Sequence, residues 1–142
     1  MNTDLESAFI DNYVVKDKRQ RYLGFIGNPK RRNTFLDMLY HGRDLDKTKF
    51  KPLSGFHETV ILERINENLV TNSCYIISVN SALDGQEMPI QAAFDKIDGY
   101  TEGMVLVFGQ CELIYYRGEP PRNEYLSIWI VASDLILVGK LL

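Results

Sequence analysis

The chain has 142 residues, which suits a single domain, residues 1–142, with a hydrophobic core of its own. Apolar residues make up 45% of the chain and charged residues 25%, so disordered, collagen-like and low-complexity classes are excluded. The formal net charge is -3, and two cysteines and two histidines are too few for a disulfide scaffold or a histidine-rich metal site.

Residues 1–70 are predicted to be mainly helical. Thr3 and Glu6 have the spacing of a capping box at the start of a first helix. Asp17 is expected to cap a second helix, which ends at Gly27. These positions predict two short amphipathic helices at the start of the chain.

The next segment is predicted to hold two further helices and a loop. Asn28 and Pro29 have the residue types of an N-cap and a first helical position, and Gly42 is a typical end for the third helix. Residues 43–55 carry turn-forming residues and lysines, so we expect a loop there. Apolar residues at helical spacing then predict a fourth helix over about 57–67.

Residues 71–142 are predicted to be mainly antiparallel sheet with one short helix near 89–97. Gly109 and Gln110 are expected to form a two-residue hairpin turn. The apolar runs predict strands at 73–79, 104–108, 111–117 and 125–131, with a further one at 135–138. The predicted fold is therefore α+β, with a helical N-terminal half packed on an antiparallel β-meander of 3–5 strands in the C-terminal half.

Charge is distributed unevenly along the chain. Residues 1–51 contain 11 Lys and Arg against 7 Asp and Glu, whereas residues 52–142 contain 5 against 12. Seven basic residues fall within 16–32, where Asp17 is the one acidic residue. The asymmetry predicts a basic half and an acidic half that face opposite ways.

The basic run at residues 30–32 falls in the first turn of the predicted third helix. A helix N-terminus has unpaired backbone N–H groups and positive partial charge, so cations there favour the binding of an anion. Candidate anion- or partner-binding residues are Lys16, Lys18, Arg19, Arg21, Lys30, Arg31, Arg32 and Asn28. The alternative is a solvated or internally paired basic surface, with Glu58, Glu63 and Glu67 as the expected internal partners.

The sequence favours a small, non-catalytic interaction module with a protein partner, in a regulatory, adaptor or immunity-like role. Nucleic-acid or phosphate binding through residues 16–32 is the first alternative, although a pI near 5.4 is unusual for a dedicated nucleic-acid binder.

A hydrolase or metal-dependent nuclease is the second alternative. It would use scattered residues, namely Asp44, Asp46, His57, Glu102, Glu112 and Glu124. No motif for a nucleophile, a metal or a phosphate loop is present in the sequence, so we predict no catalytic residues, no metal and no cofactor.

The first residues lack the basic and apolar regions of a secretory signal, and we expect a cytoplasmic protein without membrane contact.

Cys74 and Cys111 lie in apolar runs and are expected to be buried, unpaired thiols. The apolar segment 135–142 is expected to be docked, as a core strand or as an added strand across a homodimer interface.

Overall fold

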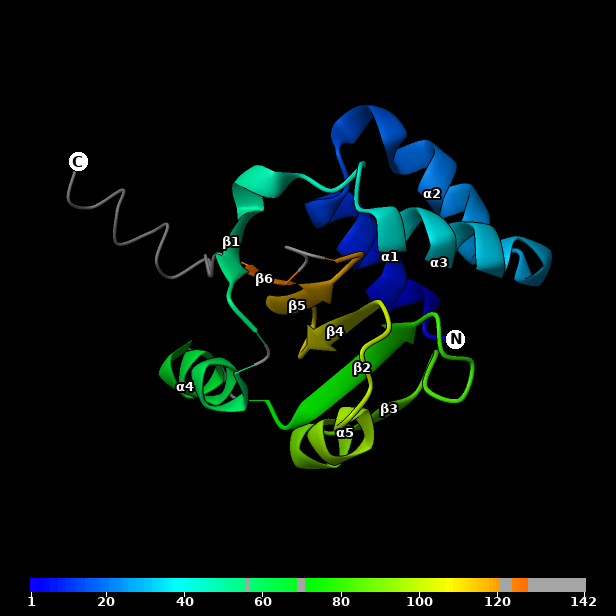
Figure 1. Ribbon diagram of the computed structural model, residues 1–142. Helices are drawn as coiled ribbons and strands as arrows, with labels where there is room; N and C mark the ends of the chain where they lie inside the picture. The colour runs from blue at the N-terminus through cyan, green and yellow to red at the C-terminus, as the bar shows by residue number, and fades with distance from the viewer. Residues whose placement is uncertain (56, 69–70, 121–123, 128–142) are drawn as a thin grey trace, which may run out of the picture.

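The computed structural model describes residues 1–55, 57–68, 71–120 and 124–127 (Figure 1). These residues form an α+β fold, as predicted, with one antiparallel sheet. The helices are α1 (Thr3–Tyr13), α2 (Arg19–Ile26), α3 (Arg32–His41), α4 (Glu58–Asn68) and α5 (Ile90–Ile97), with short 3-10 turns η1 (Lys16–Lys18), η2 (Pro29–Arg31) and η3 (Lys47–Lys49). The strands are β1 (Phe50–Leu53), β2 (Ser73–Ser78), β3 (Glu87–Pro89), β4 (Met104–Phe108), β5 (Leu113–Arg117) and β6 (Glu124–Ser127).

The six described strands run in the order β1-β6-β5-β4-β2-β3, and every neighbouring pair is antiparallel. The count exceeds the expected three to five because β1 and β3, both short edge strands, carry weak sequence signals. β4 lies inside the sheet between β2 and β5, as its wholly apolar sequence predicts.

Helices cover both faces of the sheet. Figure 1 shows α1, α2 and α3 on one face, with α4 and α5 on the other. The side chains of β4 alternate accordingly, since Val105 and Val107 join the first core cluster and Leu106 and Phe108 join the second. Sequence patterning predicts the helices but does not predict that two of them lie beneath the sheet.

The ends of two helices differ from their predicted caps. The N-cap of α1 is Asn2, whose side chain accepts a hydrogen bond from the backbone N–H of Leu5, so the predicted capping box of Thr3 and Glu6 does not form. Asp17 lies inside the turn η1, and α2 begins after Lys18 without a side-chain cap. In both cases the helix begins one or two residues away from the predicted position.

The third helix begins and ends as predicted. The Asn28 side chain accepts a hydrogen bond from the N–H of Lys30, and Pro29 occupies the first turn. That turn is a 3-10 helix, which continues directly into α3 at Arg32. Gly42 ends α3 in the left-handed conformation, with a φ of 68°.

Two predictions about loops are wrong. The expected loop at 43–55 contains η3 and the edge strand β1, which pairs with β6 from Phe50↔Ser127 to Leu53↔Glu124. The β4–β5 hairpin has a four-residue connection, because Phe108 pairs with Leu113, in place of a two-residue turn. Gly109 and Cys111 both adopt positive φ, 64° and 71°, in this connection.

The other C-terminal predictions fall partly within the described residues and partly outside them. The short helix near 89–97 is confirmed. Cys74 and Cys111 are buried and unpaired, as expected. The last part of the predicted 125–131 strand, the strand at 135–138 and the docked segment 135–142 lie outside the described residues.

Candidate binding surface

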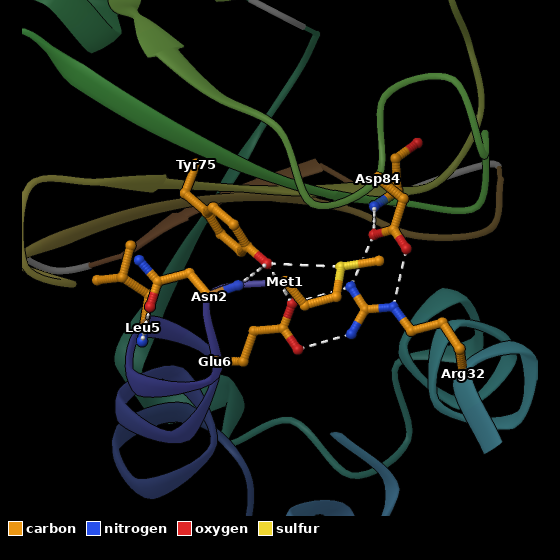
Figure 2. A network of polar contacts seen from close by, with 8 residues as sticks. Met1, Asn2, Leu5, Glu6, Arg32, Tyr75 and Asp84 are labelled. Atoms are coloured by element: carbon orange, nitrogen blue, oxygen red, sulfur yellow. Dashed lines mark hydrogen bonds and ion pairs between the residues drawn. The ribbon is translucent and has the colours of Figure 1, made fainter. Parts of the chain in front are cut away.

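Arg32, one of the predicted anion-binding residues, is bound inside the molecule. Its Nη1 and Nη2 donate to Oε1 and Oε2 of Glu6 at 2.6 and 2.9 Å, and its Nε and Nη2 donate to Oδ2 and Oδ1 of Asp84 at 2.8 and 2.7 Å (Figure 2). The guanidinium also lies over the Phe35 ring, 5.0 Å from its centroid. The Tyr75 hydroxyl donates to Oε2 of Glu6 at 2.5 Å. Arg32 therefore joins α1, α3 and the turn after β2.

This network is largely removed from solvent. The side chains of Arg32, Glu6 and Asp84 are 13%, 0% and 5% exposed. Burial alone would lower the pKa of Arg32, but the hydrogen bonds that it donates to Asp84 and Glu6 outweigh burial and raise the pKa. The pKa of Tyr75 is also raised, first by burial and then by its hydrogen bond to Glu6. Arg32 is thus a permanently charged structural group.

The position of Arg32 corrects part of the predicted anion site. The anion-site prediction places three cations in the first turn of the third helix, whereas Arg32 points into the interior and two carboxylates match its charge, as in the internally paired alternative. Its partners also differ from the expected ones. Glu58, Glu63 and Glu67 belong to α4, on the opposite face of the sheet from α3 (Figure 1).

Two other predicted cations gather around one aromatic ring. The guanidinium carbons of Arg21 and Arg31 lie 5.8 and 5.0 Å from the ring centroid of Phe25. Phe25 is buried, whereas both arginines are exposed. A cation over an aromatic face is stabilised by about 0.5–1 kcal/mol at such exposed sites, so the ring holds two positive charges at the surface of α2.

Beside this ring lies a groove that we call the basic groove, with a volume of about 440 Å³. Its lining residues come from η1, α2, α3 and the chain just after α3, namely Lys18, Arg21, Asp37, Met38, His41, Arg43 and Asp44. Lys18 and Arg21 are predicted site residues, while Arg43 and His41 are not. The structure therefore brings together cations that are separated in the sequence.

The acidic residues of the basic groove have partners of their own. Asp44 accepts a hydrogen bond of 2.7 Å from the Tyr22 hydroxyl, whose pKa is raised by burial and by this bond. The His41 ring lies between two carboxylates, with Nδ1 2.9 Å from Glu119 Oε2 and Nε2 3.6 Å from Asp37 Oδ1. Lys18, Arg21 and Arg43 have no ion pair with any described carboxylate.

The remaining predicted site residues are spread around the same corner of the molecule. The Arg19 Nε donates to the backbone oxygen of Val14 at 2.9 Å, which fixes the start of α2. Asn28 caps η2, so its side-chain oxygen is already engaged. Lys16 and Lys30 are exposed and lie in the turns at either end of α2.

Three of the residues considered for catalysis accept hydrogen bonds within the fold. Asp46 accepts hydrogen bonds from Thr48, and Glu112 accepts one from the backbone N–H of Gln110, so both stabilise local turns. Glu124 accepts a hydrogen bond of 2.6 Å from the Tyr115 hydroxyl. Among the described residues, no group of three or more His, Cys, Asp or Glu side chains could hold a metal ion. None of the described helices is long and apolar enough to span a bilayer.

Sequence reasoning missed Glu6, although a signal for its role is present. Glu6 precedes Phe9, Ile10 and Tyr13 by three, four and seven residues, so it lies on the apolar face of α1. A carboxylate on a buried helix face needs a cationic partner. Nothing in the sequence identifies that partner as Arg32, because the two residues meet only in the folded chain.

Comparison with protein-family models, with curated proteins and with solved structures finds no match to this chain.

Proposed function

We propose that this chain is a cytoplasmic, non-catalytic interaction module that binds an acidic surface of a protein partner in a regulatory, adaptor or immunity-like role. One observation carries the proposal. Lys18, Arg21 and Arg43 come from three separate segments and line one groove, where no described carboxylate forms an ion pair with them. Unpaired cations in a concave surface attract a partner of opposite charge and orient it.

A protein partner suits the groove better than a nucleic acid does. Asp37 and Asp44 line the groove together with the cations. A phosphate backbone presents closely spaced negative charges and would meet both carboxylates. An acidic protein surface carries fewer charges and also offers donors, so it can match both signs. Phosphate or nucleic-acid binding is therefore the second candidate, supported by the two arginines that converge on Phe25.

Charge reversal in the groove tests the proposal. We would measure binding of a fluorescent Glu-rich peptide and of a labelled DNA duplex at low ionic strength, to the parent protein and to the double variant Arg21→Glu/Arg43→Glu. We expect the peptide to bind the parent in a salt-sensitive way and the variant on the order of 10-fold more weakly.

The double variant Lys51→Glu/Lys96→Glu is the matched control, because it changes the net charge equally at exposed residues of β1 and α5. Equal weakening by both double variants would show a general charge effect and would refute the groove as the contact. Tighter binding of the duplex than of the peptide would favour the nucleic-acid candidate. Failure of the parent to bind either probe would overturn both.

A further inference from the structure

A second groove lies on the other side of α3, and we call it the acidic groove. It has a volume of about 360 Å³. One wall consists of α3 residues at helical spacing and the other of residues before β4 and after β2, and together these are Asn33, Leu36, Asp37, Tyr40, Val79, Glu102 and Gly103. Its ionisable carboxylates, Asp37 and Glu102, make its charge opposite to that of the basic groove.

The backbone that carries Glu102 is fixed from beneath by a buried arginine. The Nε of Arg117 donates to the backbone oxygen of Glu102 at 2.9 Å, and its Nη2 donates to that of Tyr100 at 2.9 Å. Arg117 belongs to β5, so the loop before β4 is tied to the sheet. The backbone that carries the Glu102 side chain is therefore set in advance of any ligand.

One carboxylate oxygen of Glu102 has no hydrogen-bond donor in the described part of the chain. This atom, Oε2, is also shielded from solvent. A buried acceptor without a donor destabilises the folded protein, and more so when it is charged. Asp37, on the facing wall, is 70% exposed, and its Oδ1 is 3.6 Å from Nε2 of His41. Because Asp37 and Glu102 both line the groove, a ligand that brings N–H donors into it would meet two carboxylates.

The rest of the groove is apolar and aromatic. Val79 is 41% exposed, which is unusual for a large apolar side chain in the described part of this chain. Gly103 allows the Tyr40 ring to approach the backbone, since a Cβ at this position would lie 2.4 Å from Tyr40 Cδ2. The ring and the valine form a surface that suits a short hydrocarbon or a planar cation.

We propose that the acidic groove binds a small organic cation with a guanidinium or ammonium head and a short alkyl tail. The head would lie between Asp37 and Glu102, and the tail would lie against Tyr40 and Val79. A guanidinium fits best, because it is planar, offers five N–H donors and stacks on aromatic rings. A volume of about 360 Å³ falls within the usual range of small-molecule sites. This site shares Asp37 with the proposed protein-binding groove, and its other lining residues are different.

A matched pair of ligands tests the proposal. N-butylguanidinium and N-butylurea have nearly the same shape, but only the first is charged. We would titrate each into the ¹⁵N-labelled protein and follow the backbone amide resonances. We expect saturable shifts at Tyr40, Val79 and Gly103 with N-butylguanidinium and none of comparable size with N-butylurea.

Three variants localise the binding. Glu102→Gln and Asp37→Asn keep the side-chain shapes and are each expected to weaken binding by about 10-fold or more, because a charged hydrogen bond is lost. Glu67→Gln removes an exposed carboxylate of α4 on the opposite face of the sheet and is expected to change nothing. Loss of amide dispersion in Glu102→Gln would mean that this variant does not fold. The affinity of Asp37→Asn, which changes an exposed residue, then tests the proposal.

Three results would overturn the proposal: no saturable shift with the cation, equal binding of the urea, or equal weakening by Glu67→Gln. Asp37 also lines the basic groove, so Asp37→Asn separates the two sites. It should weaken the guanidinium at the acidic groove without weakening an acidic peptide at the basic groove. Loss of both interactions would show that the variant disturbs α3 as a whole.

Discussion

Neighbouring residues of the same chemistry have different roles in this protein. Lys30 and Arg31 are exposed, while Arg32 is enclosed by Glu6 and Asp84. The chain turns from η2 into α3 at this point, so the direction of each side chain changes over three residues. Sequence shows the cluster of charge, and the fold decides which cation remains at the surface.

Replacing Arg32 with methionine is expected to lower the free energy of unfolding by about 3–5 kcal/mol, because Glu6 and Asp84 would remain buried without their cation. Lys30→Met changes an exposed residue of the same turn and should stay within about 0.5 kcal/mol of the parent. Urea denaturation followed by circular dichroism measures both. Similar losses for the two variants would contradict a structural role for the Arg32 network.

Buried tyrosines are expected to make the protein sensitive to strong alkali. Burial raises the pKa of Tyr13 from 10.0 to about 12, and burial also raises the pKa of Tyr116. A group whose pKa is higher in the folded state contributes stability below its unfolded pKa and loses it as the pH rises.

These tyrosines should therefore leave the free energy of unfolding unchanged below about pH 9. The free energy of unfolding should fall between pH 10 and 12, as the hydroxyls ionise. Tyrosinate absorbance and circular dichroism, recorded on the same samples, measure ionisation and unfolding together. Ionisation of all tyrosines near pH 10 with the fold intact would show that these hydroxyls are accessible to solvent.

At the scale of the element, the helices were easier to predict than the edge strands. α3 is specified by local chemistry at both ends, with Asn28 and Pro29 before it and Gly42 after it. β1 has no comparable signal, because its sequence contains Lys51 and Pro52 and reads as a loop. It becomes a strand only by pairing with β6, which is a long-range contact that no local pattern encodes.

The end of α3 supplies a test of this local control. Gly42 has a φ of 68°, and a Cβ there would lie 2.5 Å from the Tyr116 hydroxyl oxygen. That hydroxyl donates to the backbone oxygen of Leu39 at 2.6 Å. Gly42→Ala is expected to lower the free energy of unfolding by at least about 1–2 kcal/mol, because it combines a left-handed alanine with this steric conflict.

Gly27→Ala is the control for that variant. Gly27 ends α2 with a φ of -85°, and a Cβ there would meet no atom within 4 Å. It should be neutral or stabilise the protein by up to about 1 kcal/mol through the unfolded state. Thermal unfolding of both variants, monitored by circular dichroism, provides the comparison. Equal effects would mean that the left-handed backbone conformation at this position does not require glycine.

At the scale of the whole molecule, the sheet is enclosed by helices on both faces. Cys74 faces the core beneath α4 and α5, whereas Cys111 joins the core beneath α1 to α3. The α+β class was predicted from the change of hydrophobic period along the chain, but this three-layer arrangement was not. Composition and hydrophobic period describe each helix or strand by itself. The face of the sheet that a helix covers depends on how the elements are connected.

The two thiols report on how the layers open. Burial raises the pKa of both, to about 12 for Cys111, so neither is expected to react with a thiol reagent in the native state. Cys74 lies in the sheet and should be labelled only through global unfolding, while Cys111 lies in the β4–β5 connection and should be labelled earlier as urea is added. Mass spectrometry after timed labelling distinguishes the two. Rapid labelling of Cys74 in buffer would contradict an enclosed sheet.

The pairing of β1 with β6 has a consequence for biosynthesis. β1 leaves the ribosome long before β6, yet β6 is its described partner in the sheet. Until Glu124–Ser127 emerges, the nascent chain therefore carries Phe50–Leu53 with its backbone hydrogen-bonding groups unpaired by that partner. Emergence of Glu124–Ser127 from the ribosome is the step at which β1 can pair with β6, and a delay before it would prolong the interval in which the chain is open to chaperones and to aggregation.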